Sequence, residues 1–314
     1  MSNTVDRRTF IKHAGVGAAA AVGMTGLAQA DPRPTNDSSE NPKENSSMKL
    51  GMVTYNMGKD MSCDELIALC KSAGLAGVEL RTTHAHGVEV TLSPDERAAV
   101  RAKFEDAGVA IAGLGSAFDF HSNVPGEVEA TIAASIEYAQ LAADVGAPGI
   151  KVRPNAIPRG EDPEITFERI GKAWGKVAAA AADMGVEVWM EVHGHEETRS
   201  LPNIRKMLDH ADHPNALVCW NSNRGEEDES GSIRKNFDLV KHAIGEVHIT
   251  EIGVYQYPWQ ELFSLLQGIN YSGYCLAEIQ YNPEPERFMR YYRTIFDLYT
   301  GRYQYPNPTA YIGS

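Results

Sequence analysis

The sequence is poor in positive charge, in cysteine and in long apolar runs. It has 29 lysine and arginine residues against 42 aspartate and glutamate residues, which gives a formal net charge of −13. Nucleic-acid binding needs clustered positive charge, so this balance argues against a nucleic-acid partner. The four cysteines lack the spacing of a zinc site. Cys63 and Cys70 also lie too far apart along one predicted helix to form a disulfide. We therefore expect four buried thiols.

The N-terminal segment has the pattern of an export signal. Arg7-Arg8 opens a twin-arginine motif, a small apolar stretch follows over 14–27, and Ala28-Gln29-Ala30 suits a cleavage site. The stretch is too short and too rich in alanine and glycine for a stable membrane anchor. We predict a twin-arginine signal peptide over residues 1–30. The twin-arginine export machinery would then be a partner, and the protein would be periplasmic or exported.

The rest of the chain divides into a linker and one folded domain. Residues 31–47 contain no large apolar side chain and are rich in proline, asparagine, serine and charge, so we predict a disordered linker. Residues 48–314 are numerous enough for a single α/β barrel domain. The last residues, 301–314, are rich in aromatic residues and proline. They would suit packing on the barrel or on a second copy of the chain, so a homo-oligomer is one expectation.

From Met48 onward, short β-branched runs alternate with longer stretches of helical periodicity. The predicted strands are 49–55, 77–81, 109–114, 149–153, 186–192, 216–221, 245–250 and 273–279. The predicted helices are about 62–73, 94–107, 126–145, 164–184, 200–210, 230–243, 259–267 and 285–299. Eight such units predict a (β/α)8 TIM barrel. A doubly wound open sheet is the alternative, but it would place a glycine-rich loop after the first strand, and that loop contains only Gly58.

The later strands end in polar side chains that suit a metal ion. Glu191 ends the fifth strand, Asn221 the sixth and Glu278 the eighth, and His248 lies in the seventh. Because the carboxyl ends of barrel strands converge on one face, we expect these four to share a site. Two carboxylates, an imidazole and an amide oxygen suit a divalent ion such as Mn²⁺, Mg²⁺, Co²⁺ or Zn²⁺. Such a set favours proton transfer next to a carbonyl through an enediolate, with Glu191 and Glu278 as acid and base.

Other polar residues are expected on the same face of the barrel. The candidates for substrate contact are Lys151 and Arg153 in the fourth strand, His84 and His86 after the second, His193 after the fifth, Trp220 and Asn223 beside the sixth, and Glu251 and Tyr257 after the seventh. Aromatic rings suit the CH face of a sugar, and cations suit a carboxylate or phosphate. Lys151 and Arg153 would alternatively pair with acids inside the barrel. The acidic run 226–229 is predicted to be a solvated loop.

This layout resembles the xylose-isomerase-like TIM barrel superfamily, which contains sugar and sugar-phosphate isomerases and epimerases. The resemblance covers roughly Met48 to the C-terminus. In that family the metal ligands are Glu, Asp, His and Glu on successive late strands, and the two Glu carry out the acid–base chemistry. The resemblance therefore assigns the ligands to Glu191, Asn221, His248 and Glu278. Asn221 departs from the usual Asp and removes one negative charge beside the cation, so metal affinity is expected to fall.

The residues and the resemblance together favour a sugar isomerase or epimerase that uses metal-assisted proton transfer, with a small-molecule sugar or sugar derivative as substrate. One alternative is a lyase or hydrolase that acts on keto-glycosides by β-elimination, since the same proton abstraction can expel a leaving group. Another is a non-catalytic sugar-binding barrel that has lost its metal at Asn221.

Overall fold

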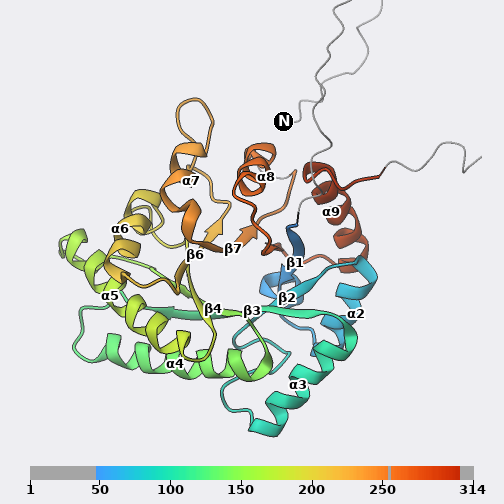
Figure 1. The fold of residues 1–314 in the computed structure, drawn as a ribbon, viewed down its shortest axis with the longest axis horizontal. Helices are drawn as coiled ribbons and strands as arrows, with labels where there is room; N and C mark the ends of the chain where they lie inside the picture. Colours follow the sequence, from blue (N-terminus) through green and yellow to red (C-terminus); the bar gives the residue numbers. More distant parts are fainter. Residues whose placement is uncertain (1–46, 254–255, 305–314) are drawn as a thin grey trace, which may run out of the picture. The chain divides into compact units, whose positions relative to one another are not determined.

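The computed structural model describes residues 47–253 and 256–304. Its centre is a closed barrel of eight strands in the order β1 to β8, with helices around it (Figure 1). The predicted TIM barrel is confirmed. No helix in the described segments is long and apolar enough to cross a membrane. The predicted signal, nearly all of the predicted linker and the residues from 305 onward lie outside the described part, so the expectations attached to them stay predictions.

Strands and helices alternate along the chain as the periodicity predicted. The strands are β1 (Lys49–Val53), β2 (Gly77–Arg81), β3 (Ala110–Asp119), β4 (Gly149–Arg153), β5 (Glu187–Glu191), β6 (Ala216–Asn221), β7 (Ile244–Ile249) and β8 (Tyr274–Ala277). The helices are α1 (Tyr55–Gly58), α2 (Cys63–Ala73), α3 (Pro94–Ala107), α4 (Glu127–Val145), α5 (Pro163–Ala182), α6 (Leu201–Ala211), α7 (Arg234–Val240), η1 (Lys241–Ala243), α8 (Trp259–Gly268) and α9 (Pro285–Tyr299). All neighbouring strands pair in parallel, and β8 closes the barrel on β1.

Strand β3 is longer than predicted and runs on to Asp119. Its first part pairs with β4 through Leu114 and Gly115, and after a register shift Asp119 lies opposite Arg153. The extra residues carry no alternating apolar pattern, which is why the sequence did not predict them as strand. They carry β3 beyond the end of β2, and the last residue of β3 lies opposite the last residue of β4.

Helix α7 begins at Arg234, although the periodicity predicted a start near residue 230. The Asp228 carboxylate accepts hydrogen bonds from the backbone N–H groups of Ser230 and Ser232, at 2.8 and 3.1 Å. These bonds fold residues 228–232 into a turn, which competes with the first turn of a helix.

Trp189 of β5 fills the barrel interior near the N-terminal ends of the strands, where 2% of it is exposed. Glycines face the ring from three other strands. A Cβ atom at Gly113, Gly149 or Gly245 would lie 2.4–2.6 Å from atoms of the indole. Only glycine at these positions lets the backbone of the three strands approach the Trp189 indole this closely. The indole fills the space that a larger side chain would occupy.

The four cysteines are buried and free, as the sequence predicted. Cys63 and Cys70 lie in α2, Cys219 in β6 and Cys275 in β8. Burial raises the pKa of the Cys70 and Cys275 thiols to about 12. These side chains therefore pack as small neutral groups.

Candidate active site

The C-terminal strand ends surround one polar cavity of about 220 Å³. Its walls come from the ends of β1, β2 and β4 to β8, through Tyr55, Arg81, Lys151, Arg153, Glu191, His193, Asn221, Asn223, Thr250, Glu251, Glu278, Ile279 and Gln280. Three of the four predicted metal ligands thus line one cavity. The fourth, His248, is fully buried beside Glu191 and Glu278.

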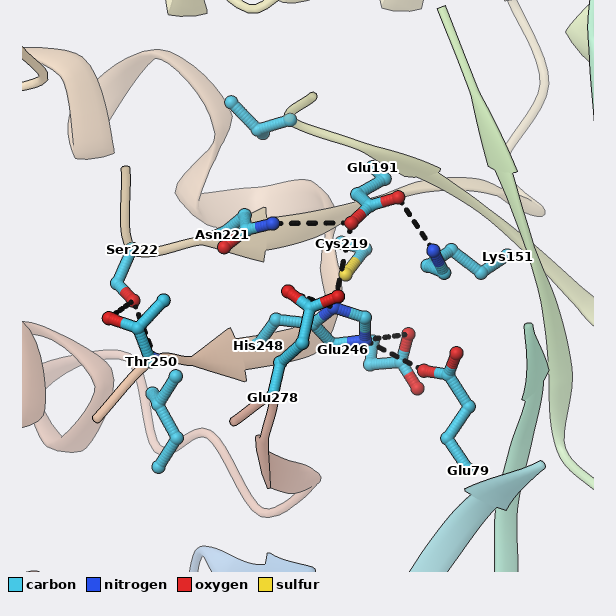
Figure 2. A network of polar contacts seen from close by, with 12 residues as sticks. Glu79, Lys151, Glu191, Cys219, Asn221, Ser222, Glu246, His248, Thr250 and Glu278 are labelled. Atoms are coloured by element: carbon cyan, nitrogen blue, oxygen red, sulfur yellow. Dashed lines mark hydrogen bonds and ion pairs between the residues drawn. The ribbon is translucent and has the colours of Figure 1, made fainter. Parts of the chain in front are cut away.

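Lys151 and Glu191 form a buried ion pair in the cavity wall (Figure 2). The Lys151 Nζ lies 2.6 Å from Glu191 Oε2, and the two side chains are 4% and 2% exposed. Burial alone would raise the pKa of Glu191, but the Lys151 ammonium and the His248 ring together outweigh burial, and the pKa lies well below its usual range. Burial also opposes the charge of Lys151, yet the carboxylates around it, Glu191 foremost, raise its pKa. Both groups are therefore charged.

The His248 ring lies between two pairs of carboxylates (Figure 2). Its Nε2 is 2.7 Å from Glu79 Oε2 and 3.5 Å from Glu246 Oε2. Its Nδ1 is 3.7 Å from both Glu191 Oε1 and Glu278 Oε2. Among the described residues, this buried Nδ1 has no hydrogen-bond partner. A carboxylate on one ring nitrogen commonly orients a histidine whose other nitrogen binds a metal.

These residues fit a single divalent cation. Glu191, His248 and Glu278 each offer a ligand atom, and the three atoms lie within 4.8 Å of one another. Lys151 bonds Oε2 of Glu191 and leaves Oε1 facing His248. The Asn221 amide lies 3.2 Å from the same Oε1, and a half-turn of the amide would present its oxygen there. The donor set carries two negative charges, and Lys151 offsets one of them.

A second group lies deeper in the barrel, where Cys219, Glu246 and His248 also approach within 4.8 Å of one another. Burial, and then the charge of Glu79, raises the pKa of Glu246 to about 8. Burial also raises the pKa of the Cys219 thiol, so this thiol is neutral. Two neutral groups make a poorer cation site than Glu191 and Glu278 do.

The structure places five of the nine predicted substrate contacts on the cavity wall, namely Lys151, Arg153, His193, Asn223 and Glu251. It adds Arg81 and Tyr55, which the sequence analysis did not single out. Arg81 ends β2 as Glu191 ends β5, so the same signal, a charged residue that closes an apolar strand, would have found it. Glu79 lies two positions before Arg81, so strand alternation turns it into the barrel as well.

His84 and His86 lie in the loop after β2 and are not among the described residues that line the cavity. His86 Nε2 lies 2.8 Å from the carbonyl oxygen of Arg81. His84 Nδ1 lies 2.8 Å from the Thr54 hydroxyl. These hydrogen bonds hold the loop on the barrel.

Trp220 lies outside the cavity, in a buried network that the sequence did not predict. Its Nε1 lies 3.2 Å from the Tyr257 hydroxyl, which donates to Glu226 Oε2 at 2.8 Å. The other Glu226 oxygen accepts from the Asn223 side chain at 3.2 Å. Glu226 is 5% exposed, so the prediction that the run 226–229 is solvated is wrong for this residue. Burial raises the pKa of Glu226 to about 8.

Glu226→Gln is expected to stabilise the protein above pH 8 but not at pH 5. The folded protein keeps the Glu226 proton up to about pH 8, whereas the unfolded chain loses it near pH 4.5. The wild-type free energy of unfolding therefore falls as the pH rises through this window. A neutral glutamine removes that loss, which is on the order of 4 kcal/mol between pH 5 and pH 8.5 at about 1.4 kcal/mol per pH unit, or on the order of 10 degrees in melting temperature.

Thermal melts at about pH 5 and pH 8.5 would measure this difference. Glu229→Gln is the matched control because Glu229 is exposed in the same loop, and its melting temperature should follow the wild type at both pH values. An equal offset of Glu226→Gln from wild type at both pH values would contradict the prediction.

The chain matches a family model described as a xylose isomerase-like TIM barrel over residues 67–293. No curated protein sequence matches it significantly. Among solved structures, it resembles the 3-keto-D-glucoside 4-epimerase of E. coli, with 17% identity and a TM-score of 0.65 over 79% of this chain and 99% of that one. It resembles the D-psicose 3-epimerase of Clostridium cellulolyticum H10, solved with D-tagatose, with 16% identity and a TM-score of 0.66 over 81% and 99%. It also resembles an IolI protein with a bound zinc atom, with 15% identity and a TM-score of 0.67 over 82% and 100%.

Proposed function

Because the chain belongs to the family of xylose isomerase-like TIM barrels, we propose that it is a sugar isomerase or epimerase that transfers a proton next to a carbonyl group. The observation that carries this proposal is the meeting of Glu191 and Glu278. These carboxylates come from β5 and from the end of β8, line one cavity, and each lies 3.7 Å from the same ring nitrogen of His248.

The two carboxylates would share the acid–base work. Lys151 keeps Glu191 ionised and fixes its orientation, so Glu191 is a base held in one position. The Glu278 side chain is 17% exposed and faces the cavity from another strand. A sugar bound between them would lose a proton to one carboxylate and regain one from the other, on the opposite face of the carbon for epimerisation.

A divalent cation would be held by Glu191, Asn221, His248 and Glu278. When bound, it would supply positive charge to the oxygens of the enediolate. Asn223 and the other polar side chains of the cavity wall would bind the sugar hydroxyls. They would orient the carbon next to the carbonyl group between the two carboxylates.

Turnover in D₂O tests the proposal. We expect that a keto sugar processed by the protein acquires deuterium at the carbon next to its carbonyl group, because the proton passes through a carboxylate that exchanges with solvent. D-Psicose, D-tagatose and a 3-keto-D-glucoside are suitable substrates, and NMR would locate the label. An isomeric product formed without any deuterium would indicate direct hydride transfer and would overturn the proposed route.

A β-eliminating lyase is the second candidate, and it begins with the same proton abstraction. Its support is the structural similarity to an enzyme named for a 3-keto-D-glucoside, since such a substrate carries a leaving group next to the acidified carbon. The same NMR experiment separates the candidates. Epimerisation gives one isomeric product, whereas elimination gives two smaller ones.

A further inference from the structure

The cavity wall formed by β2 and β4 carries two guanidinium groups, Arg81 and Arg153. Both side chains are partly buried. Within the described residues, neither forms an ion pair with a carboxylate, whereas the third cation of the cavity, Lys151, is paired with Glu191. In a chain with a net charge of −13, two cavity cations without acidic partners call for an explanation.

Both arginines lie against the same short stretch of β3. A Cβ atom at Gly115 would lie 3.5 Å from Cγ of Arg81, an ordinary van der Waals distance, so the Arg81 side chain packs directly against this glycine. Arg153 donates from Nη2 to the carbonyl oxygen of Ala117 at 3.1 Å. Two arginines that come from different strands thus contact the extension of β3.

Each guanidinium keeps donors that the protein does not use. Arg153 Nε is buried and has no hydrogen-bond partner among the described residues. The Arg81 guanidinium lies over the Tyr55 ring, 5.5 Å from its centre, which holds its plane without occupying its N–H groups. A planar fork of N–H donors matches the paired oxygens of an anionic group better than the single oxygen of a hydroxyl.

We propose that the substrate is an acidic monosaccharide whose carboxylate or phosphate group is bound by Arg81 and Arg153. Its carbonyl end would then face Glu191 and Glu278. The cavity volume of about 220 Å³ is below the roughly 300–1,000 Å³ of ordinary ligand pockets, which suits one sugar unit. This inference rests on the proposed function for the sugar class, while the anion site depends on the two arginines alone.

Calorimetric binding tests the proposal without requiring turnover. The probes are D-glucuronate, D-glucose 6-phosphate and neutral D-glucose, each titrated into the wild-type protein. We expect at least one anionic sugar to bind 10-fold or more tightly than glucose, with an affinity that falls as salt is added. The stronger of the two anionic probes identifies carboxylate or phosphate. Equal binding of all three sugars, or no binding of either anionic sugar, would overturn the proposal.

Arg81→Met and Arg153→Met locate the site. Each should weaken binding of the preferred anion by about 10-fold to 100-fold, a loss typical of a charge-assisted hydrogen bond, and leave the melting temperature and glucose binding nearly unchanged. Arg159→Met, on an exposed loop, is the control and should bind as the wild type does. Unchanged anion binding in both cavity variants would overturn the proposal.

Glu278→Gln distinguishes a failure of the proposed proton-transfer function from a failure of the proposed anion site. If it binds the anion normally but has no activity, both stand. If it stays active, the proposed chemistry fails while the anion site stands.

Discussion

Glu278→Gln should lower turnover by about 10²–10⁴-fold, the usual contribution of a positioned acid–base group, while leaving the fold intact. The glutamine amide keeps the size of the side chain but neither accepts nor returns a proton. The Glu278 side chain is partly exposed, and among the described residues it forms an ion pair with His248 alone, at 3.7 Å from Nδ1. Its loss therefore leaves no deeply buried charge without a partner. Initial rates with a processed keto sugar, together with a thermal melt, would measure both effects.

Glu251→Gln is the matched control for this variant. Glu251 lines the same cavity but lies outside the group around His248. Its substitution by glutamine removes one negative charge from the cavity wall, as Glu278→Gln does, with the same change in side-chain size. We expect its rate to stay within about 10-fold of wild type, as for a change outside the reacting groups. Equal losses in both variants would show that cavity charge, and not proton transfer by Glu278, sets the rate.

Glu191→Gln should also lose activity, but it is the less informative variant. Its partner Lys151 is 4% exposed and would keep a buried charge without its closest carboxylate. Removal of one member of a buried pair costs about 3–5 kcal/mol. A fall in melting temperature should therefore accompany the loss of rate, and it should be absent in Glu278→Gln.

Asn221→Asp should raise the affinity for Mn²⁺ on the order of 100-fold. Two unit charges about 4 Å apart interact by about 4 kcal/mol at an effective dielectric constant of 20, and desolvation of the new carboxylate offsets part of that gain. The new charge would also stand next to Glu191 Oε1, which is 3.2 Å from the present amide. The variant should therefore melt at a lower temperature than wild type without metal and gain more from added metal.

Titration calorimetry with MnCl₂ at fixed pH would measure the change, with Asn223→Asp as the control. Asn223 lines the cavity two residues further on, and its side chain bonds the carbonyl oxygen of Val192 at 2.6 Å. It should gain much less affinity. The same gain in both variants would mean that general electrostatic attraction, and not coordination by residue 221, holds the ion.

The fold and the convergence of the site residues were predictable because they depend on local patterns. Strand positions follow from apolar periodicity, and a parallel barrel gathers the ends of its strands at one face. Glu191, Asn221 and Glu278 could therefore be assigned to one cavity with no knowledge of their contacts.

The partners of these residues were not predictable, because a contact depends on elements far away in the chain. Lys151 had several acids within reach of a barrel interior, and only the packing of β4 against β5 selects Glu191. Glu79 and His248 are 169 positions apart. Glu226 stands in a polar loop sequence and becomes buried because Tyr257, 31 positions later, covers it.

The four buried thiols make the fold insensitive to the redox potential of its surroundings. Thiol–disulfide exchange and oxidation both proceed through an accessible thiolate. All four cysteines are buried, and Cys70 and Cys275 have pKa values near 12. The folded protein therefore offers no accessible thiolate for an oxidant to attack. It also contains no disulfide that a reductant could break, since every cysteine of the chain is free. The folded barrel would therefore keep one covalent structure in a reducing and in an oxidising compartment.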